Sequence, residues 1–217
     1  AKIEVEEGTT VVIEDNSNNQ SGKVEAGTDA GFENNGTINI EGGTIGEGAI
    51  ENNGTVNVNG GTIEEDAIDH NENATIGQYV YTVAELQAAI DAAKDTATET
   101  GLNKIEIGFG ADIEGDVDVY IAQKEGVNLI INGQGFKYDG TFYIHGDSRY
   151  TGAETLKFTN INFEAETAKY FIDSNSTGSK ERYAHNVTVQ NCTFEGDGTD
   201  SAVAIRIGQG YNIKVQN

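Results

Sequence analysis

Two aspartates and an arginine near the end of the sequence come nearest to a catalytic set. Asp197 and Asp200 lie in a polar, glycine-containing turn, and Arg206 follows within a short apolar stretch. Abstraction of a proton beside a sugar carboxylate requires an acidic Ca²⁺ site that neutralises charge and a basic group close to it. Because two carboxylates make a weak Ca²⁺ site, we interpret the two aspartates as a turn and Arg206 as an outward-facing strand residue.

A second acidic segment offers oxygen ligands for a metal ion. Asp112, Asp116 and Asp118 follow one another at short intervals, with Glu114 between them. Their spacing departs from that of an EF-hand loop, so a solvated edge is the simpler interpretation. We therefore expect no resident cofactor, and Ca²⁺ is the one ion that these residues could hold.

Two long polar segments, 146–154 and 173–185, are the places where a binding surface is expected, because solenoids usually bind through loops on one edge. Tyrosine rings stack on the C–H faces of sugars, and carboxylates accept hydrogen bonds from sugar hydroxyls. The residues that we expect to contact a glycan or a receptor are Asp147, Arg149, Tyr150 and Tyr183.

The elements that position these residues are predicted by internal repeats. The segment from Glu33 to Ile45 is echoed after 18 residues by the segment from Glu51 to Ile63. Each repeat contains three short strand-like stretches, which matches a narrow coil of a parallel β-helix whose coils must stack to bury their apolar faces. In such a stack Asn35 lies above Asn53 and Asn39 above Asn57, where their amides can form ladders.

A wider repeat follows in the second half of the chain. A strand, a polar corner and a second strand recur from residues 129, 156, 187 and 213, at intervals of 26 to 31 residues. This period is typical of a solenoid. Because the last repeat stops after its first strand, we expect the natural protein to continue beyond Asn217.

One amphipathic helix is predicted between the two kinds of repeat, at about residues 82–94. Thr82 and Glu85 form a capping-box pattern, and an apolar stripe follows on one face. A helix at this place would cover the open end of the second stack. The sequence thus predicts an all-β fold with two domains: a narrow solenoid over residues 1–77 and a helix-capped parallel β-helix over residues 78–217, truncated at its C-terminus.

The formal net charge of −23 limits the partners of this chain. Phosphate groups repel such a surface, so we expect this chain to bind neither nucleic acid nor anionic membranes. The sequence has no apolar stretch of the roughly 18–20 residues needed to span a bilayer, so we expect no membrane insertion.

Several phrases of the sequence resemble a known group of proteins. The segments 82–93, 131–144, 156–165 and 186–196 are similar to the right-handed parallel β-helix, pectate-lyase-like superfamily, and the resemblance covers roughly residues 79–217. The repeated pattern NNGTxNxxGGTI looks like repeats in surface proteins and phage appendages of gut bacteria. The resemblance implies the right-handed parallel β-helix fold. Because this superfamily includes polysaccharide lyases and hydrolases, bacterial adhesins and phage tailspikes, the resemblance leaves the function open.

We expect a non-catalytic, extracellular stalk or glycan- or receptor-binding segment of a bacterial surface adhesin or of a phage fibre. A polysaccharide lyase or glycoside hydrolase acting on acidic polysaccharide is the first alternative, and a purely structural spacer is the second. The resemblance implies a homotrimer if the chain belongs to a phage fibre and a monomer if it belongs to an adhesin.

Overall fold

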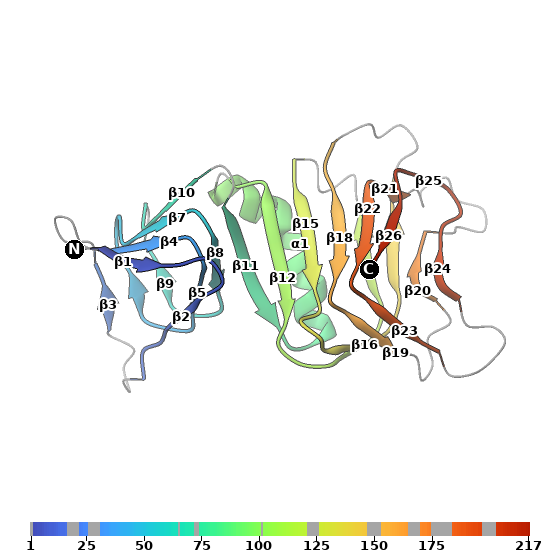
Figure 1. Cartoon of the computed structure of the whole chain (residues 1–217), viewed down its shortest axis with the longest axis horizontal. Helices are drawn as coiled ribbons and strands as arrows, with labels where there is room; N and C mark the ends of the chain where they lie inside the picture. The colour runs from blue at the N-terminus through green and yellow to red at the C-terminus, as the bar shows by residue number, and fades with distance from the viewer. Residues whose placement is uncertain are drawn as a thin grey trace. The chain divides into compact units, whose positions relative to one another are not determined.

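A computed structural model describes residues 2–16, 22–25, 31–64, 66–71, 74–100, 102–120, 126–146, 153–164, 170–174, 184–196 and 203–217. The contacts divide the chain into two compact units, residues 1–79 and residues 80–217 (Figure 1). Both units consist of short strands that pair in parallel from one coil to the next. The predicted all-β parallel solenoid with a helix is therefore confirmed.

Three parallel sheets form unit 1. The first contains β1 (Lys2–Val5), β4 (Gly31–Asn34), β7 (Ile50–Asn52) and β10 (Ile68–His70). The second contains β2 (Thr10–Ile13), β5 (Thr37–Ile40), β8 (Thr55–Val58) and β11 (Thr75–Val80). The third contains β3 (Lys23–Val24), β6 (Thr44–Ile45) and β9 (Thr62–Ile63). The 18-residue repeat sets the register, since Ile38 lies opposite Val56.

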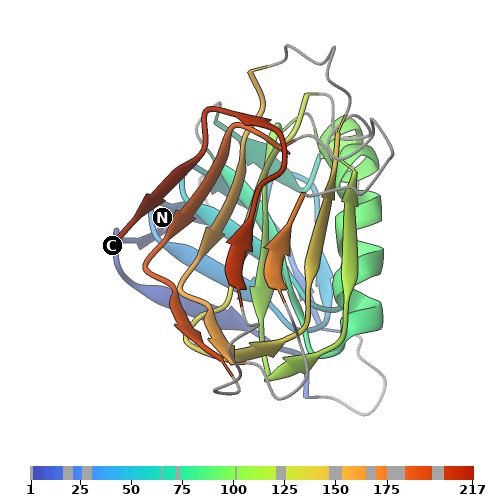
Figure 2. The same ribbon diagram turned by 90° about the vertical axis from the view of Figure 1, so that its right-hand side faces the viewer.

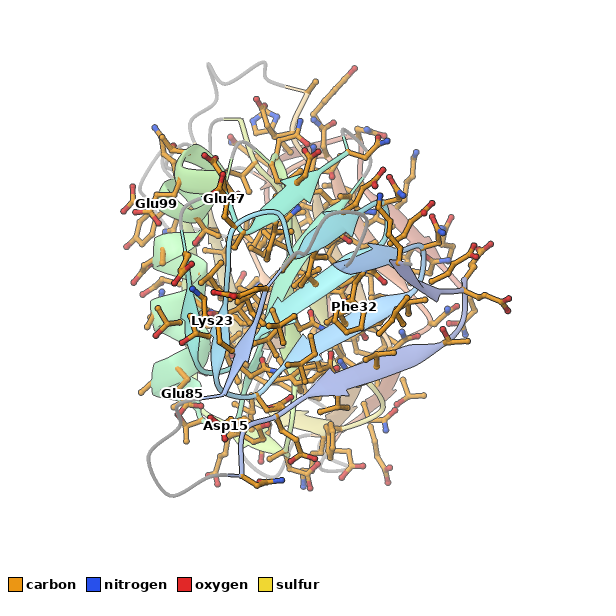
Figure 3. All side chains as sticks on the ribbon, turned by 90° about the vertical axis from the view of Figure 1, so that its left-hand side faces the viewer. Asp15, Lys23, Phe32, Glu47, Glu85 and Glu99 are labelled. Carbon is orange, nitrogen blue, oxygen red and sulfur yellow. The ribbon has the colours of Figure 1, made fainter. Side chains whose placement is uncertain are left out.

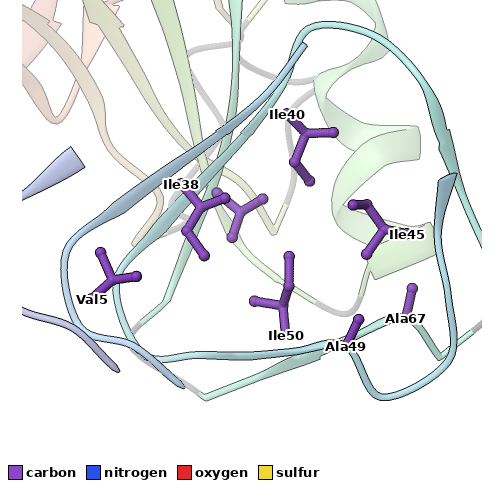
Figure 4. Close-up of a cluster of buried hydrophobic side chains, with 8 residues drawn as sticks. Val5, Ile38, Ile40, Ile45, Ala49, Ile50 and Ala67 are labelled. Atoms are coloured by element: carbon purple, nitrogen blue, oxygen red, sulfur yellow. The ribbon is translucent and has the colours of Figure 1, made fainter. Parts of the chain in front are cut away.

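The core of unit 1 is formed by side chains that alternate inward along these strands. Ile38, Ile40, Ile45 and Ile50 are fully buried and point into one cluster with Val5 (Figure 4). Complete burial of an isoleucine contributes about 1.5–3 kcal/mol. Because neighbouring coils supply the contacts, a single coil could not form this cluster.

Amide ladders connect the coils of unit 1, as predicted. Asn53 Nδ2 donates to Asn35 Oδ1 at 3.2 Å, and Asn57 Nδ2 donates to Asn39 Oδ1 at 2.8 Å. Each ladder joins equivalent positions of consecutive repeats, so it favours the register in which the isoleucines also stack.

A deeper ladder that the sequence analysis missed lies at the corner between the first two sheets. Asn34 Nδ2 donates to Asn52 Oδ1 at 2.7 Å, and Asn52 Nδ2 contacts His70 Nδ1 at 3.2 Å. Asn34 and Asn52 are fully buried. Asn52 Oδ1 also accepts from the backbone N–H of Gly54 at 3.1 Å, which fixes the orientation of the amide. The donor Nδ2 therefore requires an unprotonated Nδ1 on His70.

The outer surface of unit 1 carries a cavity of about 200 Å³ beside β3. Two of the charged residues that line it, Asp15 and Lys23, are labelled in Figure 3, and both have partners. The Asp15 carboxylate accepts from Gly22 N at 2.6 Å, and Lys23 Nζ pairs with Glu25 and Glu64 at 2.8 and 2.9 Å. The hydrogen bonds that Lys23 Nζ donates to the two glutamates raise the pKa of Lys23. These exposed pairs link β3 to the corner that follows β9.

Unit 2 contains wider coils. Within unit 2, parallel pairing joins β12 (Lys104–Phe109), β15 (Asn128–Asn132), β18 (Leu156–Thr159), β22 (Val187–Gln190) and β26 (Lys214–Gln216) in this order. A second sheet contains β13 (Ile113–Glu114), β16 (Lys137–Asp139), β19 (Asn162–Glu164) and β23 (Thr193–Glu195). A third contains β14 (Val117–Tyr120), β17 (Phe142–His145), β20 (Tyr170–Asp173) and β24 (Val203–Arg206). A short pair joins β21 (Ala184–His185) to β25 (Gly210–Tyr211).

Asparagines form the predicted polar corners of these coils. Asn160 separates β18 from β19 and Asn191 separates β22 from β23, and both have a φ of 52°. Asparagine adopts this left-handed conformation at lower cost than most residues, which explains its recurrence at the corners.

Aromatic side chains fill the core of unit 2. Tyr138 stacks on Phe142 with ring centroids 4.3 Å apart, and Phe163 stacks on Phe194 at 4.9 Å. The hydroxyl of the fully buried Tyr138 donates to Gly115 O at 2.7 Å, and burial raises its pKa. Large rings are needed because a wide coil leaves more space than aliphatic side chains fill.

Helix α1 (Val83–Thr100) stands beside the sheets of unit 2 and contacts β12 and β14 (Figure 2). Its N-terminus is capped by Thr82 Oγ1, which accepts from Glu85 N at 3.2 Å, while the Glu85 carboxylate accepts from Tyr81 N at 2.7 Å. The helix runs six residues beyond the predicted end at Lys94. In these last turns the hydroxyls of Thr98 and Thr100 donate back to the carbonyls of Lys94 and Thr96, at 2.9 and 2.7 Å, a contact that adds nothing to helix stability.

Candidate functional site

The three aspartates considered as metal ligands bind three different partners. Asp112 Oδ1 accepts from Lys137 N at 2.8 Å, and Asp116 Oδ1 accepts from Thr141 N at 2.7 Å. Asp118 instead contacts a side chain, described below. Within the described ranges no group of three or more histidine, cysteine, aspartate or glutamate side chains could hold a metal ion. Asp112 and Asp116 thus connect one coil to the next through the backbone.

Arg206 lies in β24, where it is held by a residue that the sequence analysis did not single out. Its Nε donates to Asp173 Oδ1 at 2.9 Å and its Nη2 to Asp173 Oδ2 at 2.5 Å. The guanidinium carbon also lies 3.5 Å from the ring centroid of Tyr170. The Asp173 hydrogen bonds raise the pKa of Arg206, so the group is a fixed cation. Asp197 and Asp200, its predicted companions, lie outside the described residues.

The strand register extends the pair of Arg206 and Asp173 into a row across the sheet of β14, β17, β20 and β24 in unit 2, which is called the third sheet from here on. Asp118 lies opposite Tyr143, Tyr143 opposite Asp173, and Asp173 opposite Arg206. Val117 and Val119 of β14 are buried, so the alternating Asp118 points away from the core. We call the outward side of this sheet the polar face; its residues are Asp118, Tyr120, Tyr143, His145, Asp173 and Arg206.

A second row of the polar face pairs Tyr120 with His145. The two rings are stacked, with centroids 4.4 Å apart and planes 15° from parallel. His145 Nε2 lies 2.6 Å from Asp118 Oδ1. The side chain of Asp118 is 49% exposed and that of His145 is 15% exposed, while Tyr120 as a residue is 41% exposed. The histidine is thus held between a carboxylate and a ring that both reach solvent.

This arrangement can bind a polar ligand that has apolar faces. The exposed tyrosine offers a rigid ring for stacking, and the carboxylate beside it accepts hydrogen bonds. A carboxylate that orients an imidazole is also found in general acid–base catalysis.

The residues expected to bind a glycan, Asp147, Arg149, Tyr150 and Tyr183, lie outside the described part of the chain. In the sequence, Asp147 follows His145, the last residue of β17, by two positions, and Tyr183 directly precedes β21.

Cys192 is a buried thiol in the corner before β23. Its Sγ donates to Gln190 O at 3.3 Å, and desolvation raises its pKa. A raised pKa disfavours the thiolate, which is the nucleophilic form. This cysteine therefore packs at a corner and is poorly suited to attack a substrate.

The sequence analysis missed Tyr120, Tyr143 and Asp173 on the polar face. A signal was present, because the alternating segments Val117–Tyr120 and Phe142–His145 each place two polar or aromatic residues on one side. The pairing of those segments was needed to see that the two sides coincide.

Comparison with protein-family models, with curated proteins and with solved structures gave no match for this chain. In the part of the chain that the structure describes, no helix is long and apolar enough to cross a membrane. The polar face therefore has to be interpreted from its own chemistry.

Proposed function

We propose that this chain is a parallel β-solenoid segment of an extracellular protein, on a bacterial or virion surface, and that its polar face binds a glycan without catalysing a reaction. The observation that carries the proposal is the exposed Tyr120 ring, stacked on His145 beside the half-exposed carboxylate of Asp118. The two adjoining segments with Asp147, Arg149, Tyr150 and Tyr183 would contribute further contacts. The superfamily suggested by the sequence, pectate-lyase-like β-helices, is part of this proposal.

A glycan array tests the proposal directly. The wild-type chain is expected to bind a defined set of glycans, and Tyr120→Ala should weaken that binding about tenfold or more, because the stacking ring is lost. Tyr211→Ala is the matched control, since Tyr211 is 68% exposed in β25, which pairs with β21 and is not a strand of the sheet that carries the polar face. Equal loss in both variants, or no binding by the wild type, would contradict the proposal. The latter result would favour a purely structural spacer.

Catalysis on an acidic polysaccharide is the competing proposal, and the contact of 2.6 Å between Asp118 and His145 favours it. A carboxylate-oriented imidazole could act as a general base. Incubation with polygalacturonate or alginate, followed by the absorbance of unsaturated products and by reducing-end release, would detect a lyase or a hydrolase. Activity in the wild type that is lost in His145→Gln would replace the binding proposal with this one.

A further inference from the structure

The edge of the third sheet is covered by a side chain of helix α1. β14 is the first strand of its sheet, so one side of its backbone faces no strand of that sheet. Gln87 of α1 lies against this edge: its Oε1 accepts from Asp118 N at 2.8 Å, and its Nε2 donates to Asp118 O at 3.0 Å. The amide group thus pairs with both polar backbone groups of one residue, as a neighbouring strand would pair with the edge.

The orientation of this amide is fixed from the helix as well. Gln87 Nε2 also donates to Asp91 Oδ1 at 3.0 Å, one turn later in α1. Because Asp91 and the carbonyl of Asp118 can only accept, both contacts require the nitrogen of the amide, and the oxygen is left for the N–H of Asp118.

The residue held in this way is the one whose side chain organises the polar face. The Asp118 carboxylate lies 2.6 Å from His145 Nε2, and the His145 ring stacks on Tyr120. Displacement of the Asp118 backbone by a few tenths of an ångström would lengthen the contact between Asp118 Oδ1 and His145 Nε2 and weaken it, because hydrogen bonds depend steeply on distance. The helix is therefore connected to the exposed ring through three consecutive contacts.

We propose that Gln87 is a positioning residue for the polar face: its amide holds the main chain of Asp118 so that the carboxylate orients His145 and, through stacking, Tyr120. This inference rests on the proposed function for its ligand, but the arrangement of the rings can be tested without one. Helix α1 then does more than pack against β12 and β14, since it determines the geometry of the binding surface.

The test compares Gln87→Met with Asp91→Ala in the full chain. Methionine keeps the length of the side chain and removes both hydrogen bonds to Asp118. Asp91→Ala removes only the contact within the helix. The first readout is the NMR chemical shift of the His145 ring protons, which sense the ring current of Tyr120 and are assigned with His145→Gln. Gln87→Met should move these resonances towards free histidine, and Asp91→Ala should leave them in place.

The second readout is binding to the array glycans, for which Gln87→Met should lose about fivefold to tenfold and Asp91→Ala less than twofold. Unchanged His145 resonances in a folded Gln87→Met protein would overturn the inference, whatever the array shows. Shifted resonances without any glycan binding by the wild type would overturn the proposed function and leave the positioning role standing.

A measurement on the wild type covers the case in which Gln87→Met does not fold. The amide hydrogen of Asp118 should exchange with solvent as slowly as the paired amides of β17. Exchange at the rate of an unpaired surface amide would show that Gln87 does not hold this residue, and the inference would fail.

Discussion

At the scale of single residues, His70 ends a buried ladder and makes the stability of unit 1 sensitive to pH. Desolvation lowers its pKa, and its Nδ1 must stay unprotonated to accept from Asn52. In the unfolded chain the pKa of His70 is about 6.5, so the unfolded chain binds the proton more readily than the folded one. We expect the free energy of unfolding to fall as the pH drops from about 6.5 through the lowered pKa. Urea unfolding at a series of pH values measures this.

His70→Asn is the matched control for that measurement, because it continues the ladder with the residue type found at positions 34 and 52. The variant lacks the titrating group, so its stability should fall less over the same pH range. Identical pH dependence in the two proteins would show that carboxylates alone cause the loss.

A second residue-scale prediction concerns the ladder itself. Asn52→Ala removes the acceptor for the fully buried Asn34 Nδ2, which keeps only its bond to Thr55 O at 2.9 Å, and the acceptor for the N–H of the half-buried Gly54. The expected cost is about 2–3 kcal/mol. Asn53→Ala, in the half-buried outer ladder, should cost about 1 kcal/mol or less. Urea midpoints give both values, and equal costs would contradict the importance of burial.

The sequence predicted the two outer ladders because both of their members lie 18 residues apart and carry the same residue type. It missed the ladder of Asn34 and Asn52, although these two residues have the same spacing and the same type. The extension of this ladder to His70 could not be predicted from residue identity, because the two preceding coils carry asparagine at that position.

At the scale of elements, the distance between coils limits which residues fit at the corners. A Cβ added to Gly54 would lie 2.2 Å from Gly36 O, so the two coils would have to separate locally. Gly54→Ala should therefore destabilise the protein by about 3 kcal/mol. Gly8→Ala is the control: a Cβ there meets nothing within 4 Å, and its φ of +79° alone should cost about 1 kcal/mol. A smaller loss for Gly54→Ala than for Gly8→Ala would contradict close stacking as the cause.

Elements were predictable where a local pattern determines them, and the polar face was not. The start of α1 follows from Thr82 and Glu85, whereas its end carries no local signal, because the buried stripe stops at Ala93 and the helix continues to Thr100. Asp173 and Arg206 are 33 residues apart, and only the coil length brings them within 2.9 Å. A variable coil length cannot be read from one sequence, so the partners of Arg206 could not be assigned.

At the scale of the whole molecule, the charge of −23 acts against compactness. Like charges repel one another over about 30 Å at 0.01 M salt, but over only about 8 Å at 0.15 M. We expect the midpoint of thermal unfolding to rise by about 5 °C between 0.01 and 0.5 M NaCl, as the carboxylates are screened. Circular dichroism at several salt concentrations measures the shift.

Removal of exposed charges should reproduce part of this effect without salt. Glu4 and Glu7 are exposed on the first coil of unit 1, so Glu4→Gln with Glu7→Gln reduces repulsion while leaving the core intact. The double variant should unfold at a higher temperature than the wild type in 0.01 M NaCl and at nearly the same temperature in 0.5 M NaCl. The opposite result would be a double variant whose unfolding temperature equals that of the wild type at each salt concentration. Local ion pairs, such as those of Lys23 with Glu25 and Glu64, would then outweigh the general repulsion, and added salt should lower the unfolding midpoint of both proteins by screening these pairs.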